Sequence, residues 1–371
     1  MDGHFIMMNT DETEEVWNMK KSINLLLILS MILSMLFISS CGKNETQSKT
    51  IIDMSGSSVE LPEKIDRVIC TSQNALEFMV AMGLEDKIIG VHKSIFNHTW
   101  SKEYISNLDI KKGFGYSPTA EAVFEAEADL VIVKDSATAE ELRNSGITAI
   151  TFRYSNKEEM FAAVSLLGEV FGKEATEYAE NWIACYEETC TYISEKVSTV
   201  KDNERVKVYF IDASGALAEN GLTTTVGGDH IVAEWFDTIG VELVTKDYSG
   251  ISSINEEEIL EINPETIVIG GWCENARKEQ LLQDIKWSDI SAVINERIYL
   301  TPVGFVSFER YAVEAPILLM YSASMMYPEL FDYDVVPEFK AFFIEYFGIE
   351  LSEEKIEYML QGYSPDGTRM D

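Results

Sequence analysis

The sequence predicts an α/β fold with two similar lobes, a cleft between them and one long helix that joins them. Three observations predict it: short apolar segments alternate with helical segments, one helix-to-strand unit occurs twice, and an uninterrupted helical stretch separates the two copies. Of the 371 residues 46% are apolar, which is enough to form packed cores. The formal net charge of −34 argues against nucleic acid as a partner.

Residues 19–41 have the pattern of an export signal. Two lysines precede an uncharged apolar run of 16 residues, and the segment ends in ISSC, which resembles a bacterial lipobox. This resemblance predicts a lipoprotein signal peptide over residues 19–40, lipid attachment at Cys41, and an extracytoplasmic protein anchored to the cell membrane. An uncleaved membrane anchor is the alternative, although the run is shorter than the ~20 residues of a comfortable span.

The residues on either side of this signal have distinct compositions. Residues 1–18 are acidic and stand ahead of the basic residues with which a signal peptide normally begins, so we interpret them as a non-native N-terminal extension. Residues 41–50 are small and polar, which is typical of a flexible tether.

One helix-to-strand unit occurs twice, at an offset of 136 residues. Residues 117–133 read SPTAEAVFEAEADLVIV, and residues 253–269 read SINEEEILEINPETIVI. In each copy a helix leads into a continuous apolar strand, which is typical of a parallel sheet covered on both faces. Similar strands and glycine-terminated helices flank both copies. The sequence therefore predicts two Rossmann-like lobes, residues 51–171 and residues 201–371 with closing helices.

Both helices of the repeat are expected to begin at a serine N-cap. In the first copy Ser117 would be the N-cap and Pro118 would take the first helical position. In the second copy Ser253 and Glu256 have the spacing of a capping box.

The stretch between the lobes predicts a single long helix. Residues 173–200 contain no Gly or Pro and carry one apolar stripe at three- and four-residue steps. A helix of this length extends ~42 Å, which is too long to be buried within one small lobe. We therefore predict a linking helix over residues 172–200 that contacts both lobes and limits how far they close. An ordinary core helix is the alternative.

Taken in order, these motifs resemble the iron-siderophore and vitamin B12 type of ABC-transporter substrate-binding protein. The resemblance implies two α/β lobes joined by one long helix, no enzymatic activity, and a monomer that carries a small-molecule metal chelate to the transmembrane subunits of an ABC permease. One departure is Ala128, where the family usually has proline. The resemblance runs from about residue 50 to 360, on residues 51–69, GLEDKIIGV (83–91), the two repeats, WSDISAVINERIYLTP (287–302) and residues 308–331.

Ligand-binding residues are expected where strands end, because open parallel sheets bind ligands at the carboxyl ends of their strands. Cations and aromatic rings there suit an anionic, flat or aromatic chelate. We expect a ferric siderophore carrying Fe³⁺, with cobalamin and haem as alternatives and no other cofactor; the same residues could instead be rim or salt-bridge residues. The candidates are His92, Trp100, Tyr116, Lys134, Arg153, Tyr154, Trp272, Phe305, Phe308 and Arg310.

Catalytic and metal-binding patterns are scarce. The sequence has no GxSxG turn and no GxxxxGK loop, so we predict no catalytic residues. His92, His98, His230 and Cys273 could be metal ligands, but no spacing brings them together, and His230 is expected to be a helix cap or a surface residue. An anchored extracellular hydrolase and a sensory or adhesive surface domain are the rival functions.

The resemblance also implies a role for Glu121 and Glu257. In the family, one glutamate on each lobe docks onto arginines of the membrane permease. Both residues stand in the first turns of their predicted helices, where the helix dipole favours a carboxylate. The alternative is a solvated helix face, on which Glu125, Glu256, Glu258 and Glu261 are equally placed competitors.

Overall fold

The computed structural model describes residues 49–213, 221–271 and 274–370. The chain divides into two units, residues 1–47 and 48–371, and the second unit contains every element named below. The predictions for residues 1–18, for the signal peptide and for Cys41 lie outside the described residues. Within the described ranges, no helix combines the length and the apolar composition needed to cross a bilayer.

The N-terminal half contains a five-stranded parallel sheet in the order β5-β4-β3-β6-β7. Its strands are β3 (Val68–Cys70), β4 (Ile88–His92), β5 (Lys112–Phe114), β6 (Leu130–Val133) and β7 (Ala149–Thr151). A hairpin of β1 (Thr50–Ile52) and β2 (Ser58–Glu60) precedes them. The helices are α2 (Gln73–Ala81), α3 (Ser101–Tyr104), α4 (Ala120–Ala126), α5 (Ser136–Asn144) and α6 (Lys157–Phe171). Every residue of β3, β6 and β7 is buried, as their continuous apolar sequences predict.

The C-terminal half contains a four-stranded parallel sheet in the order β10-β8-β12-β13. Its strands are β8 (Lys207–Ala213), β10 (Glu242–Leu243), β12 (Thr266–Gly271) and β13 (Ile298–Leu300), and a separate pair is formed by β9 (Thr224–Val226) and β11 (Ile251–Ser253). The helices are α8 (Ile231–Thr238), α9 (Glu256–Ile262), α10 (Glu274–Gln283), α11 (Ser291–Ile294), α12 (Ala315–Met326), α13 (Val335–Phe347) and α14 (Glu353–Leu360). The predicted α/β fold is confirmed.

The helices of the repeat begin two residues later than predicted. Their N-caps are Thr119 and Asn255, whose side chains accept hydrogen bonds from the first turns of α4 and α9. The prediction of serine caps was wrong because both serines have other roles. Ser117 hydrogen-bonds the hydroxyl of Thr138 at 2.8 Å, and Ser253 belongs to β11. The two shifts are equal, so the offset of 136 residues holds in three dimensions.

The residues that connect these helices to their strands are also equivalent. The Oδ2 atom of Asp129 accepts a hydrogen bond from the backbone N–H of Arg67 at 2.9 Å. In the second half, the Oε2 atom of Glu265 accepts one from the backbone N–H of Lys207 at the same distance. Each carboxylate therefore secures the start of the first strand of its sheet, and the longer glutamate replaces the aspartate without loss of this contact.

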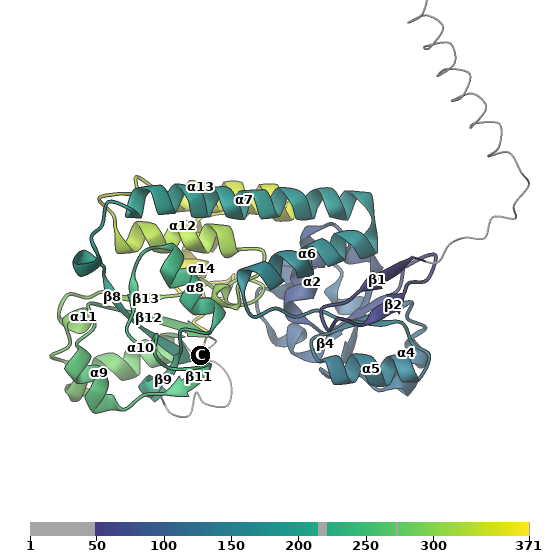
Figure 1. Ribbon diagram of the computed structural model, residues 1–371, viewed down its shortest axis with the longest axis horizontal. Coiled ribbons are helices and arrows are strands. Elements are labelled where there is room, and N and C mark those ends of the chain that lie inside the picture. Colours follow the sequence, from purple (N-terminus) through teal and green to yellow (C-terminus); the bar gives the residue numbers. More distant parts are fainter. Residues whose placement is uncertain (1–48, 214–220, 272–273, 371) are drawn as a thin grey trace, which may run out of the picture. The chain divides into compact units, whose positions relative to one another are not determined.

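Helix α7 (Lys173–Val197) separates the two halves and ends three residues before the predicted end at 200. Its 25 residues extend ~37 Å. Trp182, which is fully buried, packs edge-on against Phe78 of α2 with ring centroids 4.9 Å apart. Further along α7, Val197 packs against Gly240, which follows α8. A Cβ atom added to Gly240 would lie only 3.0 Å from the side chain of Val197. The helix thus contacts elements of both halves (Figure 1).

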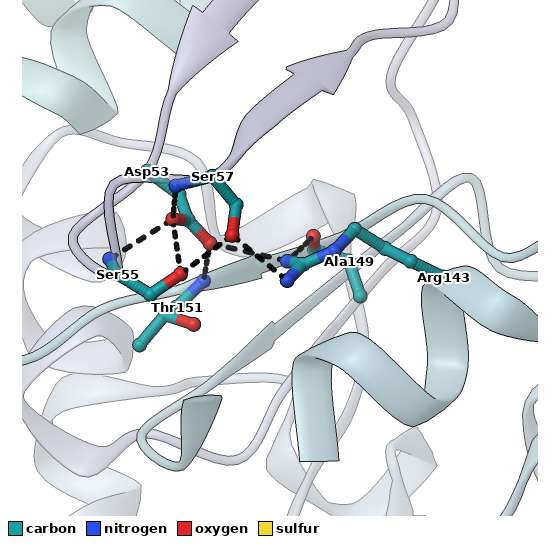
Figure 2. Close-up of polar contacts among 6 residues, drawn as sticks. All are labelled: Asp53, Ser55, Ser57, Arg143, Ala149 and Thr151. Carbon is teal, nitrogen blue, oxygen red and sulfur yellow. Dashed lines mark hydrogen bonds and ion pairs between the residues drawn. The ribbon is translucent and has the colours of Figure 1, made fainter. Parts of the chain in front are cut away.

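The turn between β1 and β2 is secured by a buried carboxylate. Figure 2 shows Asp53 receiving hydrogen bonds from Ser55, Ser57 and Thr151 and an ion pair with Arg143 at 3.2 Å. Burial acts to raise the pKa of Asp53, but the hydrogen bonds from these residues outweigh it and hold the pKa below its usual value. The hairpin is therefore attached to β7 and α5 by one ionised side chain.

Candidate functional site

A cavity of about 720 Å³ lies at the carboxyl ends of both parallel sheets. In the first sheet the strand order reverses between β3 and β6, and the residues that follow these strands, Thr71–Asn74 and Lys134, line the cavity. In the second sheet it reverses between β8 and β12, and Asp212 near the end of β8 lines the opposite wall. Open α/β sheets bind ligands at such reversal points. The other lining residues are Ser94, His98, Tyr116, Phe152, Arg153, Tyr154, Phe210, Val226, His230, Ile231, Val232, Ile251, Glu309 and Arg310.

Three cations converge in this cavity: Lys134, Arg153 and Arg310. Lys134 and Arg153 form no ion pair with any residue in the described ranges, and the Nε atom of Arg310 lies 3.8 Å from a carboxylate oxygen of Glu309. Burial lowers the pKa of Lys134, and the positive charge of Arg310 lowers it further. Lys134 and Arg310 therefore repel each other, and an anion bound between them would relieve this repulsion.

Arg310 follows the last strand of the second sheet, yet its backbone is bound by side chains of the N-terminal half. The side-chain amide of Asn74 donates to the backbone carbonyl oxygen of Arg310 at 3.0 Å. The hydroxyl of Tyr154 donates to the backbone carbonyl oxygen of Tyr311 at 2.7 Å. The indole N–H of Trp182 in α7 donates to the carbonyl of Val313 at 2.9 Å. These bonds fix the backbone around Arg310 relative to the N-terminal half, which carries Lys134 and Arg153.

Two acids, Asp212 and Glu309, and the imidazole of His230 also line the cavity. Glu309 is 6% exposed, and its Oε2 atom accepts hydrogen bonds from the hydroxyls of Thr301, at 3.0 Å, and Ser307. Burial raises the pKa of Glu309, and Arg310 opposes that rise. His230 caps α8, as predicted, and also lines the cavity. Burial lowers the pKa of His230 and Asp212 opposes this, so we expect a mostly neutral ring at pH 7.

Four of the sequence-predicted ligand residues lie away from the cavity. Trp100 and Phe305 are 0% exposed and Phe308 is 2% exposed, and the indole N–H of Trp100 donates to a backbone carbonyl at 2.9 Å. His92 is stacked on Tyr116, with ring centroids 3.6 Å apart, and so supports a lining residue without lining the cavity itself. These rings fill the cores beside the cavity because burying large apolar surfaces is favourable. Trp272 lies outside the described residues.

The lining residues that the sequence reasoning missed include the turn from β3 into α2. Its letters TSQN, residues 71–74, form a polar run between an apolar strand and an apolar helix, and that run was an available signal. His98, which the sequence suggests only as a metal ligand, and Glu309, which no sequence pattern singles out, also line the cavity. Within the described residues, no group of three or more His, Cys, Asp or Glu side chains could hold a metal ion.

Glu121 and Glu257 occupy the second positions of α4 and α9, and both are exposed. Within the described residues, neither carboxylate accepts a hydrogen bond or forms an ion pair. In Figure 1 both helices lie on the side of the second unit that is remote from α7. Three competing glutamates have partners inside the protein: Glu125 with Lys112 at 3.4 Å, Glu256 with Lys286 at 2.7 Å and Glu258 with Tyr248 at 2.9 Å.

Comparison with known proteins supports one family for this chain. The family described as periplasmic binding protein matches residues 68–303. YvrC, an ABC transporter substrate-binding lipoprotein of Bacillus subtilis (strain 168), is 25% identical over 264 residues, 69% of this chain and 79% of that protein. The iron(3+)-hydroxamate-binding protein FhuD of the same organism is 18% identical over 298 residues, 76% of this chain and 91% of that protein.

A solved structure agrees with this assignment at the level of the fold. The molybdate-bound molybdate-binding protein MolA of Haemophilus influenzae superposes with a TM-score of 0.70 at 18% identity, covering 82% of this chain and 99% of that chain. The family match spans both parallel sheets and the helix that joins them. The chain therefore belongs to the periplasmic binding protein family, as a substrate-binding protein of an ABC transporter.

Proposed function

We propose that this protein binds a ferric siderophore outside the cell membrane and delivers it to the transmembrane subunits of an ABC permease. The observation that carries the ligand class is the convergence of Lys134, Arg153 and Arg310 in one cavity of a chain whose net charge is −34. Guanidinium and ammonium groups bind anionic oxygens through charge-assisted hydrogen bonds. The name of FhuD, a relative that binds an iron(3+)-hydroxamate, supports the same class.

The size of the cavity favours a chelate over a bare oxyanion. Its volume of about 720 Å³ falls within the 300–1,000 Å³ that is usual for small-molecule sites. Molybdate is a second candidate because MolA binds it and because the same cations would attract it. A single tetrahedral oxyanion would fill only a small part of the cavity, so we rank it below the chelate. Cobalamin and haem are the alternatives among larger ligands.

We propose that Cys41 carries a lipid and that residues 41–50 tether the binding domain to the membrane. The ISSC motif and the description of YvrC as a lipoprotein support this attachment. In the proposed cycle the monomer closes slightly around its ligand, as residues 51–171 and 201–371 move relative to one another about α7. Glu121 and Glu257, exposed and unpaired on the two halves, would then meet arginines of the permease.

A titration of the mature chain with defined ligands tests this proposal. The probes are a ferric trihydroxamate, a ferric tricatecholate, cyanocobalamin, haemin and molybdate, with binding followed by calorimetry. We expect one of the ferric chelates to bind most tightly, and the double variant Lys134→Gln, Arg153→Gln to weaken it at least tenfold. The control Lys201→Gln removes an exposed cation that pairs with Glu204, and it should leave binding unchanged.

Two results would contradict the proposal. No heat of binding with either ferric chelate would remove the siderophore class, and tightest binding of molybdate would favour the second candidate. Turnover of a chromogenic ester by the purified chain would instead favour the anchored hydrolase.

A further inference from the structure

Each half of the second unit exposes one large apolar side chain next to its unpaired glutamate. On α4, Phe124 is 57% exposed and stands three residues after Glu121. Residues three apart on a helix are surface neighbours, so the ring and the carboxylate form one patch. The side chain of Glu125 pairs with Lys112, which leaves the carboxylate of Glu121 as the free anion beside the ring.

The C-terminal half forms a similar patch from different elements. Ile285 is 83% exposed in the short helix η6 (Ile285–Trp287). The two residues after it, Lys286 and Trp287, both donate hydrogen bonds to Glu256, at 2.7 and 3.1 Å. Because Glu256 precedes Glu257 in the first turn of α9, these bonds place Ile285 beside the turn that presents the unpaired carboxylate.

The exposed apolar residues of the two patches are not at equivalent positions of the repeat. By the offset of 136 residues the counterpart of Phe124 is Leu260, which is half-buried and packs against the core of the C-terminal half. The glutamate thus comes from the repeat in both halves, whereas the exposed apolar residue comes from α4 in one and from η6 in the other. Single exposed apolar residues are common, but here the same pairing arises twice by separate routes.

We propose that Glu121 with Phe124, and Glu257 with Ile285, are two docking patches that each bind one half of the membrane permease. This inference rests on the proposed function and adds apolar contacts to it. The partner surface that fits is an arginine next to an apolar socket, because an exposed ion pair gives orientation but little affinity. Burying a phenylalanine and an isoleucine would supply the affinity. A membrane of anionic lipids fits less well, since it would repel the two carboxylates.

Site-specific photo-crosslinking in the native host cell tests the inference. The photoreactive residue p-benzoylphenylalanine replaces Phe124 in one variant and Ile285 in another, and Ile344 on α13, 49% exposed, serves as the control position. We expect crosslinks from positions 124 and 285 to a permease transmembrane subunit identified by mass spectrometry. Combining either probe with Glu121→Arg and Glu257→Arg should abolish these crosslinks, and position 344 should give none.

A second measurement separates this inference from the function on which it rests. The double variant Phe124→Ser, Ile285→Ser should bind its ligand with unchanged affinity. The concentration of ligand-loaded protein that gives half-maximal transport should rise at least tenfold. If uptake falls in the glutamate variants but not in the serine variants, or if crosslinks lead only to lipid, the apolar patches are wrong and the transport function stands. If neither set changes uptake and no probe reaches the permease, the proposed delivery function fails.

Discussion

Glu77 of α2 and Glu314, which immediately precedes α12, are neighbours in the core, and their side chains are 0% and 1% exposed. Glu77 also accepts a hydrogen bond from the backbone N–H of Val313 at 3.0 Å, and Glu314 accepts one from the hydroxyl of Tyr104 at 3.1 Å. Burial, and then the neighbouring Glu314, raise the pKa of Glu77 well above its usual value of 4.5. Two buried carboxyl groups in contact cannot both ionise, so the pair retains a proton at neutral pH.

The variant Glu77→Gln should therefore stabilise the protein at neutral pH. The stability that the pair contributes is fully present below about pH 4.5 and is lost as the pH rises toward the folded-state pKa, because only the unfolded chain then releases the proton freely. Glutamine keeps an oxygen that can accept the hydrogen bond from Val313, and it cannot ionise. We expect a gain of about 1–3 kcal/mol in the free energy of unfolding at pH 7, a usual range for the effect of a poorly paired buried polar group.

Urea unfolding of the wild type and the variant at pH 4.5 and pH 7 measures this effect. The exposed residue Glu141 provides the control, because Glu141→Gln should leave the pH dependence of stability unchanged. A variant Glu77→Gln that is equally or less stable than the wild type at pH 7 would show that the pair does not hold a proton there.

The hydrogen bond from Trp182 to Val313 predicts a difference between two buried tryptophans. The indole N–H of Trp182 donates at 2.9 Å, whereas that of Trp235 is buried without a hydrogen-bond partner in the described residues. Trp182→Phe and Trp235→Phe remove similar volumes, but only the first leaves a buried carbonyl unpaired. Thermal unfolding should show a loss larger by about 1–2 kcal/mol for Trp182→Phe. Equal losses of stability in the two variants would mean that the hydrogen bond from Trp182 to Val313 does not stabilise the protein.

The carboxylate of Asp53 should be a main attachment of the first hairpin. Asp53→Ala removes hydrogen bonds to Ser55, Ser57 and Thr151 and the ion pair with Arg143, so we expect a loss of about 2–4 kcal/mol at pH 7. Because the folded-state pKa of Asp53 is lowered, this contribution is present above its usual pKa of 3.8 and declines as the pH falls below it. Chemical unfolding at pH 7 and pH 3 measures both effects.

The control for Asp53 is Asp109→Ala, which removes an exposed carboxylate that pairs with Lys102. It should change stability by less than about 0.5 kcal/mol. A similar small change for Asp53→Ala, or a loss that does not shrink at pH 3, would contradict the role assigned to the buried carboxylate.

Reversing the charges of Glu121 and Glu257 should abolish transport without affecting ligand binding. The double variant Glu121→Arg, Glu257→Arg would repel the permease arginines that we propose as partners, so we expect uptake of the loaded chelate to fall at least tenfold. The matched control is Glu125→Arg, Glu261→Arg, which changes exposed glutamates of the same two helices. Uptake measured with radioactive iron should fall only in the first variant, and an equal fall in both would assign the effect to overall charge.

The sequence predicted the fold more reliably than the site. Strands that are buried on both faces of a parallel sheet appear in the sequence as continuous apolar runs, and the repeated unit is visible in the sequence directly. The caps of α4 and α9 were displaced because Ser117 bonds Thr138 from another element, and local spacing cannot show such a contact. Helix ends depend on one or two hydrogen bonds and are correspondingly harder to predict.

Lys134 and Arg153 closely follow strands, and Arg310 lies in the loop after the last strand. All three line the cavity, since topology alone brings strand ends together. Trp100 and Phe305 are buried and do not line the cavity, because an aromatic ring in such a loop can turn into the core as easily as into the cavity. The position of Arg310 depends on Asn74, which is distant in the sequence, and no local pattern reveals that bond.

A crystal structure of the mature chain with the ferric chelate that binds most tightly tests the central claim most directly. We predict that the chelate lies between the ends of the two parallel sheets. Its anionic oxygens should lie within hydrogen-bond distance, ~3.2 Å, of side-chain nitrogen atoms of at least two of Lys134, Arg153 and Arg310. A chelate bound elsewhere on the chain, or one in the cavity that contacts none of the three cations, would contradict it.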